Sequence, residues 1–332
     1  MLRGSRPIRF TAALVGALTL AAGPGTAAAK VAAVPYRSVP SGMGLSSSVL
    51  PAQGGRAGVP AFSHIFVVVM ENLGYSQALA TPGFATLARH YGLATRYYGV
   101  AHPSLPNYLA LTGGSTFGIT SDCTSCLVNA DNLASQLARA RISFTAYMEG
   151  IPTPCYLAPY GGVDYAGKHD PFRYYLSVRR SRAQCSRIRP ESELAAALRG
   201  PPSDLSRFVW VTPNLCHDGH DCAAATAASW LDGFVSRVVR SAAWRDGGVL
   251  FVTWDESNAG NGAVTTEGTV VSTGGGGHVA TLVISPRLSS RRRVTVAYNH
   301  YSLLATIEDA LGLPLLRRAR TARPMAAFFS SP

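Results

Sequence analysis

His64-Ile-Phe-Val-Val-Val-Met70 is an apolar run that stops abruptly at Glu71-Asn72, and the architecture of the 332-residue chain follows from such runs. β-Branched and aromatic residues without polar alternation predict a strand buried on both faces, as strands are in parallel sheets. Val249-Leu-Phe-Val-Thr-Trp254 is a second run of this kind, and it stops at Asp255-Glu256. Both runs therefore predict core strands whose carboxyl ends carry polar residues.

The rest of the chain alternates between strand and helix patterns. Further buried strands are expected at 143–148, 208–212 and 279–285, and helices at 82–91, 131–140, 223–241 and 301–311. The last helix has an apolar face and is followed by Gly312, a residue that commonly ends helices. This alternation predicts a doubly wound, three-layer α/β/α sandwich with a mostly parallel sheet.

In open α/β sheets, ligands bind beyond the carboxyl ends of the strands. The polar residues that follow the predicted strands are carboxylates, amides and histidines, which are the ligands of hard or borderline divalent cations. The loop after the 208–212 strand adds His217, Asp218 and His220, and Glu149 follows the 143–148 strand. A hydrolytic metal centre at this edge is the first hypothesis.

The segment Ala101-His-Pro-Ser-Leu-Pro-Asn107 is the most specific motif. Ser104 is expected on a proline-flanked turn ahead of a helical pattern that starts near Pro106. A hydroxyl at a helix start lies near free amide groups, which suits a phosphoryl group, and a divalent metal would activate it as a nucleophile. The alternative is that Ser104 and Asn107 simply cap the helix.

The chain divides into a short leader, a linker and one large domain. Residues 1–29 read as a secretory signal, with three arginines before an apolar stretch that is shorter than the roughly 20 residues of a bilayer span. An uncleaved anchor is the alternative. Residues 30–60 predict a flexible linker, and residues 61–332 a catalytic domain with an insertion at about 150–190. The expected location is extracellular.

The six cysteines all follow the predicted signal. In an exported chain an even number of cysteines favours disulfides. A zinc half-site or a redox motif remains an alternative for Cys123 and Cys126. A bridge between Cys216 and Cys222 would pin the loop that carries Asp218.

The formal net charge of +12 favours anionic partners such as phosphate esters, acidic lipids or nucleic acid. A solvated basic surface explains the charge equally well. No nucleic-acid-binding motif is present, and we infer neither a nucleic-acid partner nor an obligate protein partner. Lys168-His169-Asp170 in the insertion fits either a substrate contact or a solvated lysine beside a structural histidine.

Five motifs, in order, resemble the bacterial phosphoesterase family of the alkaline phosphatase superfamily, which includes acid phosphatases and phospholipases C. They are the first strand with Glu71-Asn72, the Ser104 segment, the loop with His217 and Asp218, the Thr253-Trp-Asp-Glu256 signature, and Asn299-His-Tyr-Ser-Leu-Leu-Ala-Thr-Ile-Glu308. The resemblance covers about residues 63–316.

This resemblance implies a role for each matching residue. Ser104 would be the nucleophile and Asn107 would bind phosphate. The implied metal ligands are Glu71, Asn72, Asp255, Glu256 and Asp218, and the implied catalytic histidines are His102, His217 and His300. His278 matches more loosely a position where relatives place a metal ligand. The cation could be Ca²⁺, Mg²⁺ or Zn²⁺, and the oxygen-rich set favours one hard cation over two zinc ions.

The resemblance thus predicts a secreted, metal-dependent phosphoric-ester hydrolase. The expected activity is that of an acid phosphomonoesterase with a phosphoseryl intermediate, and membrane phosphoinositides are one candidate class of substrate. A phospholipase C that cleaves the diester bond is the nearest alternative. A secreted anion- or lipid-binding protein without turnover is the alternative from a different class.

Overall fold

The computed structural model describes residues 58–258, 263–264, 270–271, 275–288 and 291–330. The predicted signal at 1–29 and most of the predicted linker at 30–60 lie outside these residues. Within the described ranges, no helix combines the length and the apolar character needed to cross a bilayer.

A nine-stranded sheet forms the centre of the domain. Its strands are β1 (Ile65–Met70), β2 (Gly92–Tyr98), β3 (Phe144–Met148), β6 (Ile188–Pro190), β7 (Phe208–Thr212), β8 (Val249–Trp254), β11 (His278–Ile284), β12 (Arg293–Val294) and β13 (Tyr298–Asn299). They lie in the order β12-β2-β11-β8-β1-β7-β3-β6, with β13 also paired to β2. β1 is parallel to both of its neighbours, β7 and β8, whereas β11 is antiparallel to β8 and β2.

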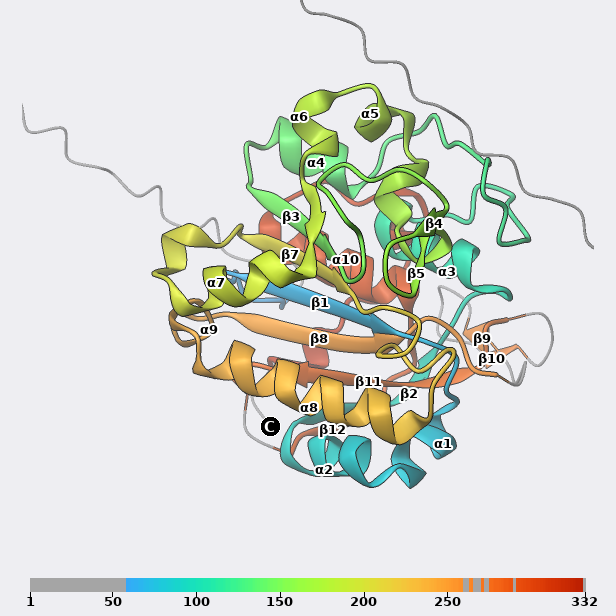
Figure 1. Cartoon of the computed structure of the whole chain (residues 1–332). Coiled ribbons are helices and arrows are strands. Elements are labelled where there is room, and N and C mark those ends of the chain that lie inside the picture. Colours follow the sequence, from blue (N-terminus) through green and yellow to red (C-terminus); the bar gives the residue numbers. More distant parts are fainter. Residues whose placement is uncertain (1–57, 259–262, 265–269, 272–274, 289–290, 331–332) are drawn as a thin grey trace, which may run out of the picture. The chain divides into compact units, whose positions relative to one another are not determined.

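Helices cover both faces of this sheet (Figure 1). They are α1 (Tyr75–Ala80), α2 (Pro82–His90), α3 (Ser104–Gly113), α4 (Leu133–Arg139), α5 (Leu176–Arg179), α6 (Arg182–Cys185), α7 (Leu194–Arg199), α8 (Ala224–Arg240), α9 (Ala242–Arg245) and α10 (His300–Leu311). α2 packs on α8 on one face, and α3 packs on α10 on the other. The prediction of a three-layer α/β/α fold with a mostly parallel sheet is confirmed.

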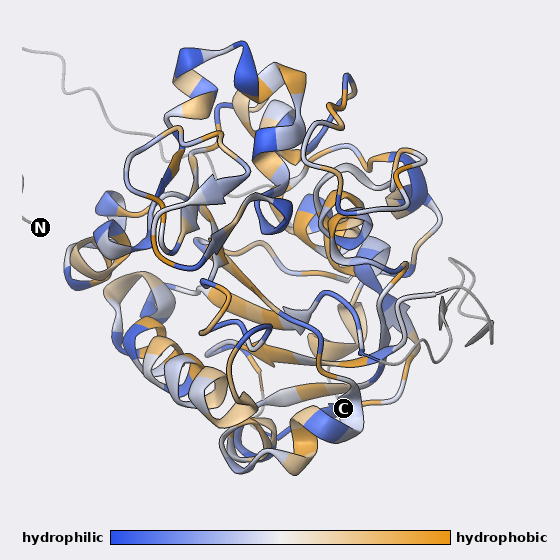
Figure 2. Ribbon diagram, turned by 45° about the vertical axis from the view of Figure 1, so that its right-hand side comes forward, coloured by the Kyte–Doolittle hydropathy of each residue, from blue (hydrophilic) through white to orange (hydrophobic). Residues whose placement is uncertain are grey.

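The apolar runs form the core as predicted. Every residue of β1, β7 and β8 is buried, and Figure 2 shows hydrophobic colour concentrated in the central strands. β2 was not predicted, because it starts at a glycine and exposes Arg96 in its middle. α3 begins at Ser104 rather than near Pro106, since proline is tolerated in the first turn, where its missing N–H has no partner to lose.

The predicted insertion contains several short elements. A hairpin of β4 (Tyr160–Gly161) and β5 (Tyr165–Ala166) is followed by the 3₁₀ helices η1 (Gly167–His169) and η2 (Pro171–Tyr174). After α5 and α6, the segment ends in β6, which pairs in parallel with β3. The last residues of the predicted insertion therefore belong to the main sheet.

All six cysteines are oxidised, in the pairs Cys123–Cys126, Cys155–Cys185 and Cys216–Cys222. The prediction of disulfides is confirmed, and Cys123 and Cys126 pair with each other instead of forming half of a zinc site. The Cys216–Cys222 bridge closes the loop between β7 and α8, as predicted. It therefore restricts the backbone that carries Asp218 and His220.

Candidate active site

The carboxyl ends of β1 and β8 bring four predicted ligands together. Asp255 N donates to Met70 O (3.0 Å), which continues the pairing of the two strands by one step. The amide Nδ2 of Asn72 donates to Glu256 Oε1 (3.1 Å), and Asn72 N lies 3.5 Å from Asp255 Oδ1. Asn72 adopts a left-handed backbone (φ 35°), which asparagine tolerates better than most residues. Glu71, Asp255 and Glu256 are all buried.

Ser104 lies beside these carboxylates at the first residue of α3. Its Oγ is 3.0 Å from Glu71 Oε2 and 3.4 Å from Glu256 Oε1, and the side chain is buried. Asp122 Oδ1 accepts from Leu105 N (2.9 Å), so a carboxylate from another loop fixes the start of this helix. The hydroxyl thus meets the acidic cluster at a helix N-terminus, where amide groups attract anions.

The electrostatics of the cluster favour a bound cation. Burial, then repulsion by Asp255 and Asp218, raises the pKa of Glu71 well above its usual range. Burial and the neighbouring Glu256 raise the pKa of Asp255 in the same way. A divalent cation would remove the repulsion that causes part of both shifts.

Two buried oxygen atoms without a hydrogen-bond donor in the described part of the chain also favour a bound cation. Asn72 Oδ1 and Asp255 Oδ2 are buried and find no hydrogen-bond donor among the residues that the structure describes. A buried acceptor without a donor is costly, and a metal ion would satisfy both. Oxygen atoms of carboxylates and an amide fit Ca²⁺ or Mg²⁺, and carboxylates also ligate Zn²⁺.

A second group of side chains surrounds the other oxygen of Glu71. Tyr108 Oη donates to Glu71 Oε1 (2.6 Å), and His169 Nε2 lies 3.3 Å from the same oxygen. His169 Nδ1 lies 3.2 Å from Asp218 Oδ2, and its ring stacks on Tyr108. Burial lowers the pKa of His169 well below its usual value and raises that of Asp218 to about 8. One buried imidazole therefore lies between two carboxyl groups.

Lys168 and His220 form the rim of this group. Lys168 Nζ donates to Asp122 Oδ2 (3.0 Å) and lies 3.3 Å from His220 Nε2. Ligand atoms of Glu71, His169 and His220 all lie within 4.8 Å of one another, which is close enough for a cation. Lys168 and His220, which pair with Asp122 and Asp221, instead offer nitrogen donors to the oxygens of a phosphoryl group.

His102 reaches the cluster from the loop before α3. Its Nδ1 forms an ion pair with Glu256 Oε2, and this contact raises the pKa of His102. The side chain is 36% exposed. The His102 ring is therefore held in place by Glu256, a candidate metal ligand, and remains accessible to solvent or to a leaving group.

Asn107 and His300 have other tasks in this structure. Asn107 Oδ1 accepts from Val100 N and Ala101 N (2.9 and 3.1 Å), and its Nδ2 donates to Ala101 O and Pro103 O (2.8 and 3.3 Å). These bonds use all four hydrogen-bonding positions of the amide. The expected phosphate contact would require breaking one of them, and Asn107 instead holds the loop that carries His102.

His300 is buried behind Asp255. Its Nε2 meets Asp255 O and its Nδ1 meets the hydroxyl of Tyr97 (3.1 Å). Because a carbonyl only accepts, Nε2 carries the proton and Nδ1 accepts from the hydroxyl. Burial lowers the pKa of His300 to about 4. His300 therefore positions the backbone of Asp255 and does not face the cluster as an acid.

His217 and His278 also point to other partners. His217 Nδ1 lies 2.8 Å from Glu149 Oε1, and its ring stacks on Trp230. Glu149 is thereby a partner of His217 and not of the metal-ligand candidates. His278 Nε2 contacts Thr95 O (2.9 Å), and tyrosine rings stack on it. Neither imidazole joins the carboxylate cluster.

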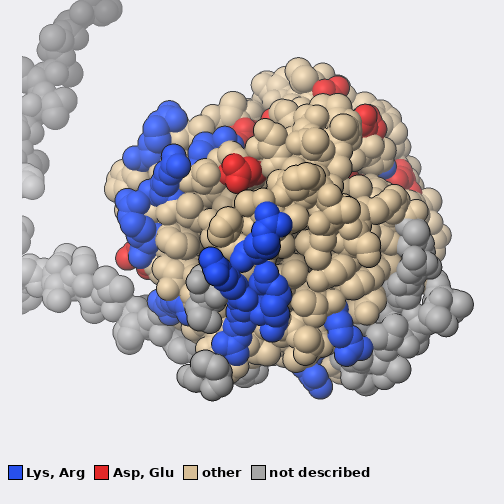
Figure 3. Space-filling model, turned by 90° about the horizontal axis from the view of Figure 1, so that it is seen from below, with Lys and Arg blue, Asp and Glu red and all other residues tan. Residues whose placement is uncertain are grey.

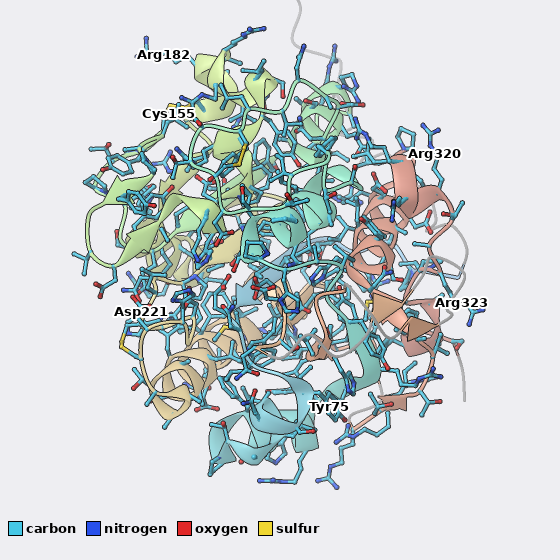
Figure 4. The ribbon with its side chains drawn as sticks, turned by 90° about the vertical axis from the view of Figure 1, so that its right-hand side faces the viewer. Tyr75, Cys155, Arg182, Asp221, Arg320 and Arg323 are labelled. Atoms are coloured by element: carbon cyan, nitrogen blue, oxygen red, sulfur yellow. A yellow bond between two sulfur atoms is a disulfide. The ribbon has the colours of Figure 1, made fainter. Side chains whose placement is uncertain are left out.

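Sequence reasoning missed the roles of Tyr108 and Asp122. It named His220 only as part of the loop after the 208–212 strand, and it left His169 and Lys168 undecided. The available signal was that Lys168-His169 offers two cationic or ligating groups within the predicted insertion. Figure 4 looks onto this edge of the sheet, with Asp221, the partner of His220 Nδ1 (2.5 Å), labelled on its rim.

Known proteins of similar sequence are phosphatases. A phosphatidylinositol-3-phosphatase from Mycobacterium tuberculosis is 30% identical over 336 residues, which cover 98% of each chain. An acid phosphatase from Aspergillus fumigatus is 29% identical over 265 residues, or 78% of this chain. The match spans 57% of the length of that fungal relative.

Solved structures share the fold at low sequence identity. A protein of a Bacteroides thetaiotaomicron locus for glycosaminoglycan metabolism superposes with a TM-score of 0.54 at 12% identity, over 81% of this chain and 77% of that one. A sulfatase from Pseudoalteromonas sp. gives 0.50 at 10% identity, over 81% and 72%. These likenesses support the fold alone.

The family model described as the Phosphoesterase family matches residues 58–314. That range contains the whole central sheet and every member of the acidic cluster. The chain therefore belongs to the phosphoesterase family.

Proposed function

We propose that this protein is a metal-dependent phosphoric-ester hydrolase whose nucleophile is Ser104. The observation that carries the proposal is the place of the Ser104 hydroxyl, buried between Glu71 and Glu256 at the start of α3. A serine that only capped a helix would accept from the amides of the first turn, and Ser104 instead faces carboxylates.

The proposed metal ligands are Glu71, Asn72, Asp255 and Glu256. A divalent cation held there would polarise a phosphoryl oxygen and lower the pKa of the serine hydroxyl. Asp218 is a further candidate, although its Oδ2 lies beside His169. The ligand types leave Ca²⁺, Mg²⁺ and Zn²⁺ as candidates.

The remaining residues account for the proton and charge movements of phosphoryl transfer. The Ser104 hydroxyl gives its proton to Glu71 Oε2 (3.0 Å) as its Oγ attacks phosphorus and forms a phosphoserine, while the ester oxygen leaves as an alcohol. Glu71 returns that proton to Ser104 Oγ when the phosphoserine is hydrolysed. His102 donates the proton to that oxygen, and it later takes one from the water that hydrolyses the phosphoserine. Lys168 and His220 bind the non-bridging oxygens, whose negative charge their donors offset.

The substrate that we propose is a phosphomonoester, with phosphoinositides as the leading class. The Mycobacterium tuberculosis relative carries the name phosphatidylinositol-3-phosphatase and aligns over nearly the whole of both chains. The fungal relatives are named acid phosphatases, which supports a monoester. We also propose secretion, because three disulfides suit an oxidising compartment.

A paired assay tests this function. The wild type should hydrolyse p-nitrophenyl phosphate, a chelator should stop it, and Ser104→Ala should lower kcat by at least about a thousandfold. Ser115→Ala, a change in the loop just after α3, is the control and should remain active. Preferential hydrolysis of bis-p-nitrophenyl phosphate would identify a phospholipase C-type diesterase instead. Phosphate binding without turnover of either ester would identify a non-catalytic binding protein.

Metal binding is tested apart from activity. Asp255→Asn and Glu71→Gln should weaken binding of the divalent cation by at least about 100-fold in calorimetric titrations, because each removes a charged ligand. Glu193→Gln, which alters a partly exposed ion pair with Arg189, is the matched carboxylate control. Unchanged affinity in Asp255→Asn would remove that residue from the ligand set.

A further inference from the structure

Three large apolar side chains are exposed in the described part of the chain, and all three lie on two loops. Leu127 is 47% exposed, Tyr160 65% and Val163 67%. Scattered exposed apolar residues need no explanation. The confinement of these three side chains to two loops needs an explanation, because the other described surface loops and helices carry no large exposed apolar side chain.

Both loops belong to segments that supply the ion pair of Asp122 and Lys168 at the edge of the candidate site. Leu127 follows Asp122 in the chain, across the Cys123–Cys126 bridge. Tyr160 and Val163 lie in the β4–β5 hairpin, which leads directly into Lys168 and His169. Because Asp122 and Lys168 form an ion pair (3.0 Å), the two segments meet at the rim.

A buried arginine joins the two loops a second time. The guanidinium of Arg173 donates to Leu157 O (2.9 Å), shortly before Tyr160, and to Thr124 O (3.4 Å), shortly before Leu127. Arg173 is only 3% exposed. This arginine is therefore an internal link that keeps the loops side by side.

The hairpin is held in a fixed conformation. Val163 N donates to Gly150 O (3.0 Å), Gly167 N to Pro159 O (2.7 Å), and Leu215 N to Asp164 O (2.8 Å). Gly162 has φ 68°, and a Cβ there would lie 1.8 Å from Gly150 O, so only glycine fits. Tyr160 and Val163 are therefore presented to solvent by an ordered backbone.

We infer that Leu127, Tyr160 and Val163, here called the apolar rim, insert into the interfacial layer of a phospholipid bilayer and so bring the site to a lipid phosphate. This inference rests on the proposed function. Tyrosine favours the membrane–water interface because its ring is apolar and its hydroxyl is wet. Lys168, which lies between the apolar rim and the acidic cluster in the candidate site, suits an anionic headgroup.

The size of the rim favours a bilayer over a protein partner. One partner of a stable protein complex buries about 800 Å², whereas even a large aromatic side chain contributes only about 150–250 Å². Three side chains on two loops fall short of a protein interface. They are sufficient for shallow, reversible contact with a lipid surface, where each buried group adds independently.

Sedimentation with phosphatidylcholine vesicles that contain phosphatidylinositol 3-phosphate tests the inference. The double variant Tyr160→Ser/Val163→Ser should partition to these vesicles at least about tenfold more weakly than the wild type, or about 1.4 kcal/mol. Leu127→Ser should show a smaller loss. Turnover of the vesicle lipid should fall in parallel, whereas turnover of soluble p-nitrophenyl phosphate should stay within about twofold.

Tyr91→Ser is the matched control. Tyr91 is a partly exposed tyrosine just before β2, at the opposite edge of the sheet, where Gly92 pairs with Val283. It should leave vesicle binding unchanged. Thermal melts of all variants exclude unfolding as the cause of a loss.

Two results would overturn the inference. One is unchanged vesicle partition in the double variant. The other is self-association of the wild type that the double variant abolishes while vesicle binding persists, which would make the rim an interface between copies of this chain. A wild type that binds vesicles but hydrolyses neither ester would refute the proposed function and leave the rim supported.

Discussion

At the scale of single residues, the acidic cluster contains side chains whose hydrogen-bonding capacity is not exhausted by the described part of the protein. Asn72 Oδ1 and Asp255 Oδ2 are buried acceptors without donors among the described residues. Asn107 and His300, which the sequence also nominated, have every polar atom engaged. Because a ligand must compete with existing bonds, the first pair is available for binding and the second pair supports the surrounding backbone.

Lys168 gives a prediction at the same scale. Lys168→Gln should lower kcat/KM for p-nitrophenyl phosphate by about 10- to 100-fold, because a charge-assisted contact to a phosphoryl oxygen is lost. Lys168→Arg keeps the charge and should lose less. Steady-state kinetics measure both.

Arg139→Gln is the control, because Arg139 also pairs with a carboxylate, Asp131 (2.9 Å), but at the end of α4 and at the surface. It should leave the kinetics unchanged. Wild-type kinetics in Lys168→Gln would mean that the ammonium only fixes Asp122.

At the scale of elements, the loop between β7 and α8 joins the two halves of the site. Glu71 N donates to Asp218 O (3.0 Å), so this loop is bonded to the end of β1. His220 N in turn donates to Asp218 Oδ1 (2.7 Å). The bridge between Cys216 and Cys222 encloses both residues. The disulfide therefore lies where it affects the geometry of the site as well as the stability of the fold.

Removing that bridge gives the second prediction. Cys216→Ser/Cys222→Ser should lower the free energy of unfolding by about 2 kcal/mol, the size expected for a short closed loop. Activity should fall more than this loss of stability explains, because Asp218 and His220 gain freedom at temperatures where the fold persists. Cys155→Ser/Cys185→Ser, which opens a bridge within the insertion, is the comparison. Equal activity losses in the two double variants would contradict a local role of the loop.

α10 carries a buried carboxyl group away from the acidic cluster, and it gives a pH prediction. Burial raises the pKa of Glu308 to about 8, although both carboxylate oxygens lie near Leu316 N (3.0 and 3.2 Å). A raised pKa means that the folded state holds the proton more tightly than the unfolded chain. Its contribution to stability is complete below about pH 4.5, the ordinary pKa, and is lost as the pH rises towards 8.

Glu308→Gln isolates this effect, because glutamine is neutral at every pH. Between about pH 5 and pH 8, urea unfolding should show the wild type losing at least about 1 kcal/mol more than the variant. Comparing the two proteins cancels the other titrating groups. Parallel stability profiles would show that the carboxyl group is not held protonated in the fold.

At the scale of the whole molecule, basic side chains gather on a face that lies away from the candidate site. Figure 3 shows lysine and arginine side chains gathered on the face that it presents. Several arginines also serve the fold, since Arg287 donates to Ala61 O (3.0 Å) and Arg292 to Ser330 O (2.7 Å). Arg292 lies beside Leu93 at the start of β2. The site lies near the end of β2 at Tyr98, since a Cβ on the next residue, Gly99, would lie 2.8 Å from Asp255 O. Five strand steps of about 3.3 Å separate the two, or roughly 17 Å.

This separation predicts a weak effect of salt on lipid turnover. The Debye length is about 8 Å at physiological ionic strength, so charges at the start of β2 are screened from a bilayer that touches the other edge. Activity on phosphoinositide vesicles and on p-nitrophenyl phosphate should therefore decline with salt to a similar degree. Arg287→Gln/Arg292→Gln should not change vesicle partition. A much steeper salt dependence on vesicles would show that the basic face takes part in the encounter.

The fold class and the main ligand candidates could be predicted from the amino-acid sequence alone. Uninterrupted apolar runs have one stable arrangement, as buried strands of a helix-covered sheet, and the carboxyl ends of parallel strands share an edge. The carboxylates after β1 and β8 therefore had to meet. Ser104 was also identifiable from the sequence, because it lies in a proline-rich segment directly before a helical pattern.

The identity of the other polar residues at the site depends on how distant segments pack in three dimensions. Asn107 and His217 stood in the right motifs, yet the first is satisfied by its own loop and the second pairs with Glu149. His169 and Lys168 stood in an insertion without a clear pattern, yet its folding brings them to Glu71 and Asp122. Local patterns record which face of an element is buried, whereas hydrogen-bond partners and long-range contacts depend on how distant segments pack.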